Sequence, residues 1–179
     1  MIDLMTPRRR ELVGRMAALG PTIAARADQV DRDAAFPYEN YADLREAGFL
    51  ALCIPEEHGG LGADFSTYAL ISEELARHCG STALTFNMHT ATMLLIGQIA
   101  DDLSMGDEER VEHDRRRTAV WRGVVEDGTI HAQPFSEGRA PGETAGFATQ
   151  AVPVDGGFRV SGRKIFASLS EAADSHNVT

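Results

Sequence analysis

The run from Cys79 to Ala100 constrains the fold most strongly, because it contains no Asp, Glu, Lys or Arg. An uncharged segment of this length is long enough to span a bilayer. Its many hydroxyl and amide side chains favour instead a helix buried inside a soluble protein, at about Thr82 to Ile99. A helix without a polar face must be surrounded by other elements. The run therefore predicts the centre of a helical bundle, with no membrane span.

The preceding residues predict the other helices of this bundle. Thr6 followed by Pro7 is typical of a helix start, and Gly20-Pro21 predicts a kink or a break in that helix. Phe36-Pro37 opens a short second helix, which Gly48 stops. One face of the first helix is apolar, and its residues are Leu12, Met16, Leu19, Ile23, Ala27 and Val30.

A glycine-rich loop, residues 54–64, separates these helices from the next. It lacks the glycine spacing of a phosphate-binding loop, so we interpret it as a tight turn. Asp64 is expected to cap the following helix. A last helix is predicted at about Asp107 to Val125. Its three arginines, residues 115–117, are interpreted as a solvated face, with an anionic partner as the alternative.

Beyond Asp127-Gly128 the pattern changes from helix to strand. Asp155-Gly156 lies between two β-prone runs and predicts a tight antiparallel hairpin. In its second strand, Phe158 and Val160 alternate with polar residues, which predicts one buried and one wet face. The expected strands are Thr129–Phe135, Phe147–Val154, Phe158–Ser161 and Lys164–Ala167.

These strands make a β part that is too short to complete a sheet, whose edge would stay unpaired. We therefore expect a multi-domain α+β protein. An all-α helical bundle, residues 1–127, is followed by an incomplete antiparallel β domain, residues 128–179. Such a chain is expected to be a fragment or to need a partner.

Two polar-aromatic segments flank the predicted hairpin, at residues 133–138 and 162–168. The hairpin is expected to bring them together. Ser136 and Ser168 would then meet the aromatic rings of Phe135 and Phe166 in one pocket. An aromatic face beside hydroxyl groups suits a flat heteroaromatic ligand with hydrogen-bonding edges, such as a flavin.

Charge and composition exclude some functions. Seventeen Lys and Arg against 27 Asp and Glu give a formal charge of −10, which argues against nucleic-acid binding. Cys53 and Cys79 are too few for a disulfide framework, and the first residues have no signal-peptide pattern. His89 is interpreted as a hydrogen-bonded core histidine, with a catalytic base as the alternative. It has no metal-ligand neighbours at suitable spacing, so no metal site is predicted.

The chain resembles the acyl-CoA dehydrogenase family of flavoproteins over essentially its whole length. The most specific stretches are Leu44–Phe49 and Pro55–Asp64. They are followed by Phe135-Ser136-Glu137 and by Gly162–Ser168. The resemblance implies the N-terminal helical domain of that family and the beginning of its middle, β-barrel-like domain, without the C-terminal helical bundle.

For the site, the resemblance implies FAD as the cofactor. Ser136 would hydrogen-bond the pyrimidine edge of its ring, with backbone contacts from Phe135. Phe166 would lie against one face of the ring, and Ser168 would hydrogen-bond near N5. The catalytic carboxylate is expected beyond Thr179, since structural roles suit Glu137 and Glu143 better. Gly142 stands where the family commonly has a serine that helps to hold CoA.

The implied reaction is α,β-dehydrogenation of an acyl-CoA thioester in fatty acid metabolism, with an electron-transfer flavoprotein or another acceptor. A cytoplasmic homodimer or homotetramer is expected, and the 179-residue chain alone is expected to be inactive. Two alternatives remain open. One is a flavin-dependent monooxygenase of the same fold, and the other is a non-catalytic or truncated subunit.

Overall fold

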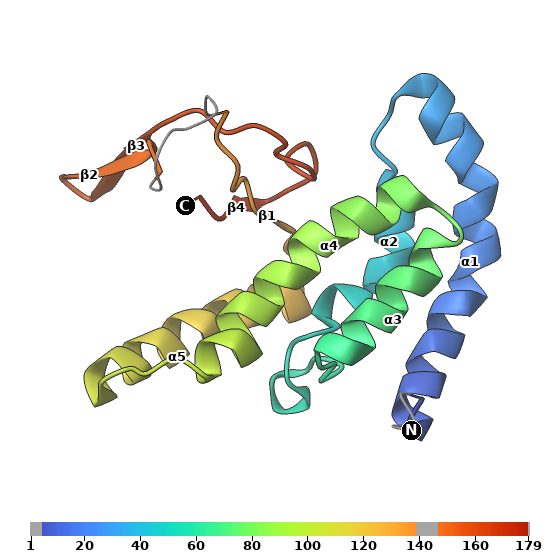
Figure 1. Cartoon of the computed structure of the whole chain (residues 1–179), viewed down its shortest axis with the longest axis horizontal. Helices are drawn as coiled ribbons and strands as arrows, with labels where there is room; N and C mark the ends of the chain where they lie inside the picture. Colours follow the sequence, from blue (N-terminus) through green and yellow to red (C-terminus); the bar gives the residue numbers. More distant parts are fainter. Residues whose placement is uncertain (1–4, 139–146, 179) are drawn as a thin grey trace.

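The computed structural model describes residues 5–138 and 147–178. The described part consists of a helical layer followed by short strands (Figure 1). The α-helices are α1 (Pro7–Asp33), α2 (Tyr38–Glu46), α3 (Phe65–Ala76), α4 (Gly80–Leu94) and α5 (Asp107–Arg122). The short helical segments are η1 (Phe49–Ala51), η2 (Glu56–His58), η3 (Leu95–Ile99) and η4 (Gly123–Asp127). The strands are β1 (His131–Ala132), β2 (Gln150–Val154), β3 (Gly157–Ser161) and β4 (Ser175–His176).

Local signals place the helix starts as predicted. The Thr6 hydroxyl accepts a hydrogen bond from the Arg9 amide at 3.3 Å, and Pro7 occupies the first turn of α1. The Asp64 carboxylate caps α3 by accepting from the Thr67 amide at 2.8 Å. Helix α1 continues through Pro21 without a break.

The core lies where α3 packs against both α1 and α4 (Figure 1). Each helix contributes fully buried apolar side chains to it. They include Leu12, Met16, Ile23, Leu44, Phe49, Ile71, Leu75, Phe86 and Met93. Burial of each such side chain stabilises the fold by about 1.5–3 kcal/mol, so this cluster dominates the stability of the helical part.

Helix α4 is the central helix, but it is not surrounded on all sides as predicted. One face packs against α3, η1 and β1. The opposite face, with its continuation into η3, leaves Leu84 57 %, Leu95 41 % and Ile99 48 % exposed. The prediction failed because the absence of charged residues indicates that a helix surface is buried. It does not identify the segment that packs against that surface.

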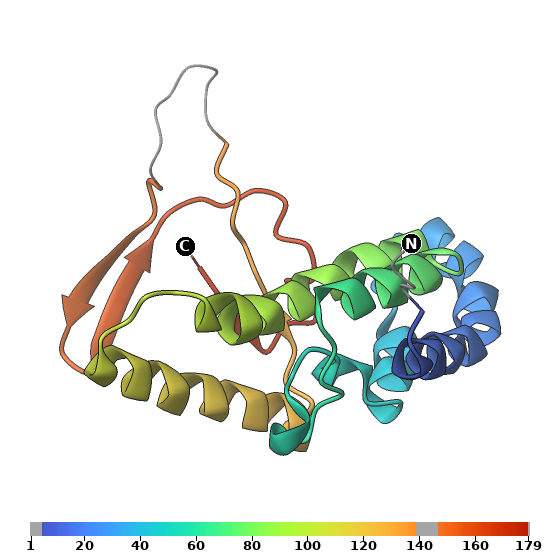
Figure 2. The same ribbon diagram turned by 60° about the horizontal axis from the view of Figure 1, so that its bottom comes forward.

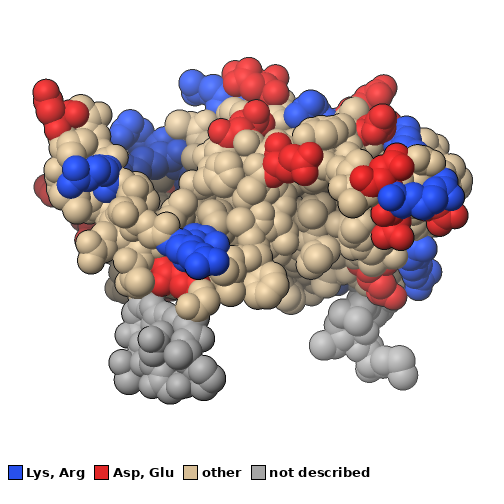
Figure 3. Space-filling model, turned by 90° about the horizontal axis from the view of Figure 1, so that it is seen from above, with Lys and Arg blue, Asp and Glu red and all other residues tan. Residues whose placement is uncertain are grey.

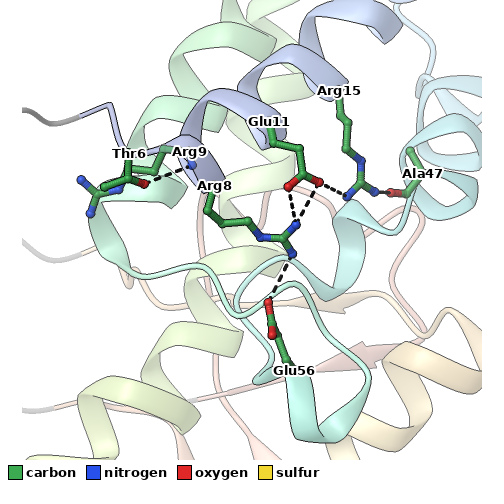
Figure 4. A network of polar contacts seen from close by, with 7 residues as sticks. All are labelled: Thr6, Arg8, Arg9, Glu11, Arg15, Ala47 and Glu56. Carbon is green, nitrogen blue, oxygen red and sulfur yellow. Dashed lines mark hydrogen bonds and ion pairs between the residues drawn. The ribbon is translucent and has the colours of Figure 1, made fainter.

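Polar contacts attach the beginning of α1 to the segment that follows α2 (Figure 4). Arg8 contacts Glu11 on its own helix at 2.8 Å and reaches Glu56 of η2 at 3.3 Å. Arg15 donates to the Ala47 carbonyl at 2.7 Å. These groups are largely exposed, so each pair contributes little to the stability of the fold.

The last helical segment ends at Asp127, where Gly128 adopts a left-handed φ of 68°. Its carbonyl accepts a hydrogen bond from Arg45 of α2 at 2.8 Å. This is the position at which the sequence predicted the change from helix to strand. The division into two domains at this point stays a prediction.

The strands form two pairs. The predicted antiparallel hairpin is present as β2–β3, with Ala151 opposite Val160 and Pro153 opposite Phe158. In Figures 1 and 2 it lies at the opposite end of the molecule from α1. Strands β1 and β4 pair in parallel, an arrangement that the sequence did not predict.

Two expectations for the β part are wrong. Every residue of β2 and β3 is exposed, so neither face of the hairpin is buried as the alternation predicted. No layer of the described chain covers the face that carries Phe158 and Val160. Residues 164–167 form no strand, because Phe166 adopts a positive φ of 54° that ends extended pairing.

Charged side chains of both signs are interspersed on the face shown in Figure 3. Arginines and carboxylates that are neighbours in the sequence form ion pairs on α1 and α5. Within residues 5–138 and 147–178, no helix combines the length and apolar character needed to cross a membrane.

Candidate functional site

The two polar-aromatic segments lie side by side, as the sequence predicted. The Ile165 amide donates to the Ser136 carbonyl at 2.8 Å. The Lys164 ammonium donates to the Phe135 carbonyl at 3.3 Å, although the two residues are 29 positions apart. The approach of the segments is therefore confirmed, while the roles of their side chains toward a ligand stay a prediction.

Glu137 is the polar centre of this junction. Its Oε2 accepts from the Ala148 amide at 2.6 Å, and its Oε1 accepts from the Thr149 amide at 3.0 Å and the Thr149 hydroxyl at 2.6 Å. Lys164 Nζ lies 2.9 Å from the same Oε1. The hydrogen bond from the Thr149 hydroxyl, followed by that from Lys164, holds the pKa of the Glu137 carboxyl well below its ordinary value. The side chain therefore has the structural role predicted for it and stays an anion.

Aromatic rings surround the same junction. Phe135 is 52 % exposed and meets Phe147 edge to face, with 5.0 Å between the ring centroids. The Lys164 ammonium lies 4.5 Å from the centroid of the Phe147 ring, within the range of a cation–π contact. One lysine thus contacts a carboxylate, a carbonyl and an aromatic face.

Phe166 lies on the second segment in an unusual conformation. Its φ of 54° is left-handed, and its side chain is 83 % exposed. Leu169, three residues later, also has a left-handed φ of 75°, but it is 3 % exposed and anchored in the core. Left-handed backbone costs a bulky residue about 1–3 kcal/mol, and such strain clusters at ligand sites. At Phe166 this strain accompanies an aromatic ring that is presented outward.

The two serine hydroxyls are available for a ligand. Ser136 is exposed and Ser168 is half-buried. Neither hydroxyl has a hydrogen-bond partner among the residues that the structure describes. Exposed aromatic faces beside unpartnered hydroxyls form a surface that fits a planar ring with polar edges. A flavin ring system has both features, so the residues present fit this group.

The interpretation of His89 as a core histidine is confirmed. The side chain is fully buried, its Nε2 donates to the Leu50 carbonyl at 2.9 Å, and its Nδ1 accepts from the His131 amide at 3.0 Å. Because a carbonyl only accepts and an amide only donates, these partners fix the neutral Nε2–H tautomer. Burial lowers the pKa of His89 to about 4.

The glycine-rich loop is a tight turn, as predicted. Two of its backbone amides have partners in the chain, since Leu61 donates to the Ala51 carbonyl of η1 at 3.0 Å and Gly62 donates to the Ile54 carbonyl at 2.9 Å. At Gly60 a Cβ atom would collide with the Ile54 carbonyl oxygen. These amides are therefore unavailable to a phosphate group.

The three arginines of α5 are paired within the chain. Glu112 contacts Arg115 at 2.8 Å and Arg116 at 2.6 Å, and these two arginines are 70 % and 74 % exposed. Arg117 pairs with Asp101 and Asp114. The interpretation as a solvated face is confirmed for Arg115 and Arg116. It is wrong for Arg117, whose side chain is only 16 % exposed and lies over the Trp121 ring.

Sequence reasoning missed Phe147, Thr149 and Lys164 as parts of the junction. One signal for Lys164 was present, because it is the only lysine among the 17 basic residues of the chain. Gly142 and Glu143, which the sequence also singled out, lie outside the described residues.

Solved structures place the fold. KijD3 in complex with FMN and dTDP-3-amino-2,3,6-trideoxy-4-keto-3-methyl-D-glucose has a TM-score of 0.81 and 28 % identity, covering 97 % of this chain and 40 % of that one. Dibenzothiophene monooxygenase TdsC from Paenibacillus sp. A11-2 has a TM-score of 0.72 and 20 % identity, covering 94 % of this chain and 38 % of its own. The same fold is thus found in a protein solved with FMN and in a monooxygenase.

Sequence comparison gives the family. The model of the acyl-CoA dehydrogenase N-terminal domain matches residues 17–113, more than half of the chain. A Bacillus subtilis (strain 168) protein named "Putative acyl-CoA dehydrogenase YdbM" is 33 % identical over 171 residues, covering 94 % of this chain and 41 % of that protein. The chain belongs to the acyl-CoA dehydrogenase family, and it spans about two fifths of the length of this relative.

Proposed function

We propose that this chain forms one wall of the flavin site in an enzyme that oxidises the Cα–Cβ bond of an acyl-CoA thioester. The proposal combines membership of the acyl-CoA dehydrogenase family with the junction of residues 133–138 and 162–168. The observation that carries it is the contact between the two segments, which places the segment with Ser136 against the one that bears Ser168 and the strained, outward-facing Phe166. We propose FAD as the cofactor, which would supply the electron acceptor for the oxidation.

Each of the four residues has a distinct role in this proposal. The Ser136 hydroxyl hydrogen-bonds the polar pyrimidine edge of the flavin ring, and Phe135 provides backbone contacts. The Phe166 ring covers one face of the flavin and excludes water from it. The Ser168 hydroxyl hydrogen-bonds near N5, the atom at which the flavin accepts electrons. Within the described residues, these groups orient the cofactor, and none of the four is a carboxylate that could remove the substrate proton.

The remaining parts of the reaction are proposals for the complete protein. It would be a homodimer or homotetramer that passes electrons to an electron-transfer flavoprotein or another acceptor. Gly142 replaces a serine that commonly helps the family to hold CoA. The identity of the substrate as a CoA thioester is therefore the part of the proposal that most requires a test.

The test is an anaerobic titration of the complete flavin-loaded protein with acyl-CoA thioesters of increasing chain length. Loss of the visible flavin absorption band with at least one thioester is the expected result. A Ser136→Ala variant is expected to bind flavin more weakly, by roughly two- to tenfold, since it loses one hydrogen bond of about 1 kcal/mol. Ser104→Ala, at an exposed loop position, is the matched control. A flavin band that no thioester bleaches would contradict the proposed substrate.

A flavin-dependent monooxygenase is the second candidate. The favouring observation is the 28 % identity with KijD3, whose bound ligand is a nucleotide-linked amino sugar and not a thioester. In this case the protein would consume O₂ rapidly when an external reductase supplies reduced flavin. A protein that neither binds flavin nor consumes O₂ would favour a non-catalytic subunit.

A further inference from the structure

We propose that Glu137 and Lys164 are positioning residues that hold the flavin-facing segments in place. The inference rests on the proposed function, because it assigns these two residues a task toward the same cofactor. We call the pair and its partners Ala148, Thr149 and Phe135 the clamp. Neither Glu137 nor Lys164 is proposed to touch the flavin itself.

The contacts of the clamp join three separate parts of the chain. Glu137, next to Ser136, binds the beginning of the hairpin through the Ala148 and Thr149 amides. It also binds Lys164, two residues before Phe166, at 2.9 Å. The segments that carry Ser136 and Phe166 are thus fixed to each other and to one hairpin end.

The clamp is shielded from solvent although its surroundings are exposed. The side chains of Glu137 and Lys164 are only 6 % and 10 % exposed, while Ser136 and Phe166 on either side are exposed. Ionic hydrogen bonds are stronger and more directional when water is excluded. Residues that hold a binding surface in place are expected to be shielded themselves and to lie next to exposed ligand-facing groups. Glu137 and Lys164 have this arrangement.

The choice of lysine supports a requirement for precise fit. The chain uses arginine at every other basic position, yet it has its single lysine here. Lysine has a compact ammonium that donates in several directions, whereas the arginine guanidinium is planar and larger. The ammonium of Lys164 lies between the Glu137 carboxylate, the Phe135 carbonyl and the face of Phe147. A guanidinium would have to displace one of these three groups.

The test compares Glu137→Gln and Lys164→Met with the wild type in the complete protein. Glutamine keeps the shape of Glu137 and removes its charge, and methionine keeps the length of Lys164. We expect each variant to bind flavin roughly tenfold more weakly and to shift the visible spectrum of the bound flavin. Titration with FAD and separately with FMN, followed by fluorescence and absorption, measures both effects.

Glu112→Gln is the matched control, because it removes the same charge from an exposed ion pair on α5. It is expected to leave flavin binding unchanged. Thermal unfolding followed by circular dichroism shows whether each variant still folds. A variant that folds but alters the absorption of the bound flavin indicates a positioning role, because a residue that only stabilises the fold would leave that absorption unchanged. If Glu137→Gln fails to fold, Lys164→Met decides by the same two readouts.

The outcomes separate the two proposals. A wild type that binds neither flavin refutes the proposed function and this inference with it. A wild type that binds flavin, together with folded Glu137→Gln and Lys164→Met variants of unchanged affinity and spectrum, overturns only the inference. The inference would also be overturned if Glu112→Gln weakened flavin binding as much as Glu137→Gln and Lys164→Met do.

Discussion

Individual hydroxyl groups in the candidate site are small contributors to cofactor affinity. A neutral hydrogen bond contributes about 1 kcal/mol net, whereas a buried aromatic contact contributes more through the area that it covers. Ser136 and Ser168 should therefore adjust the orientation and electronic properties of the ring. Phe166, already strained into an outward-facing conformation, should contribute most of the contact area.

The first prediction concerns Ser168. Replacement by alanine in the complete protein is expected to shift the absorption maximum or the reduction potential of the bound flavin, because a hydrogen bond near N5 is lost. The unfolding temperature should stay within about 2 °C of the wild type, since Ser168 has no partner among the described residues. Redox titration and a thermal melt measure the two quantities. An unchanged flavin signal would argue against the assignment of Ser168.

The second prediction concerns the glycine-rich loop. Gly60→Ala is expected to destabilise the protein by about 1–3 kcal/mol, because the new methyl group would collide with the backbone carbonyl of Ile54, which has little freedom to move. Gly14→Ala is the control. Gly14 lies inside α1, and a methyl group added there would have no neighbour within 4 Å, so alanine should stabilise by about 0.5–1 kcal/mol. Urea unfolding gives both values, and equal effects of the two substitutions would refute the packing argument.

Helix α4 connects the helical part to the first strand. Through His89 it binds η1 at the Leu50 carbonyl and β1 at the His131 amide. The helical layer and the first strand are thus joined by one neutral imidazole. Protonation of this ring would give Nδ1 a hydrogen where it now accepts one, and would break the bond to β1.

The third prediction follows from this element. The unfolded chain takes up a proton at His89 near pH 6.5, while the folded chain resists until about pH 4. The unfolded state therefore binds more protons in this window, and stability falls as the pH is lowered from about 6.5 to 4, by up to ~1.4 kcal/mol per pH unit. Burial lowers the pKa of His131 too, against an opposing effect of Asp174, and adds to the same trend.

Urea unfolding at pH 7.0, 6.0 and 5.0 measures this dependence. His176→Gln, which changes an exposed histidine on β4, should keep the slope of the wild type. A free energy of unfolding that stays constant from pH 7.0 to 5.0 would contradict the neutral, buried state of His89.

Elements defined by local signals were the ones that the sequence predicted well. The Thr6 and Asp64 caps and the Asp155-Gly156 turn act within a few residues, so their structural effects can be read directly from the chain. The meeting of residues 133–138 and 162–168 followed from the hairpin. In contrast, the parallel pairing of β1 with β4 depends on contacts more than 40 positions apart, such as the Ile130 amide with Asp174 at 2.8 Å.

Two features of the site had no local signal. The left-handed Phe166 breaks the usual preference of an aromatic residue, so propensity predicted a strand where the chain is strained. The predicted burial of α4 and of the hairpin was too high, since an apolar pattern does not identify the segment that packs against it. Both failures occur at surfaces that face away from the described core.

At the scale of the molecule, two surfaces each expose several apolar side chains. One is the stripe of Leu84, Leu95 and Ile99 along α4 and η3, and the other is the hairpin face with Phe158 and Val160. The chain spans about two fifths of the length of the relative it matches at 33 % identity. The carboxylate at the junction, Glu137, is held as an anion by four donors, which keeps its pKa low and makes it a weak base.

The fourth prediction follows at this scale. The isolated 179-residue chain is expected to show no turnover of any acyl-CoA, because the carboxylate at the junction, Glu137, is held by four donors and is therefore a weak base. Assays with a dye as electron acceptor, with added FAD and thioesters of several chain lengths, measure this directly. Activity above that of a sample denatured by heat would refute the placement of the base.

The clamp also makes the chain's one lysine a reporter of local opening. A lysine-specific endoprotease has a single cleavage site in this polypeptide, after residue 164, and that bond stays protected while the ammonium is held by Glu137. The rate of this single cut, followed by mass spectrometry, should rise in Glu137→Gln and fall when a flavin is bound. One digestion would thus measure, without any optical signal from the cofactor, how often the two ligand-facing segments separate.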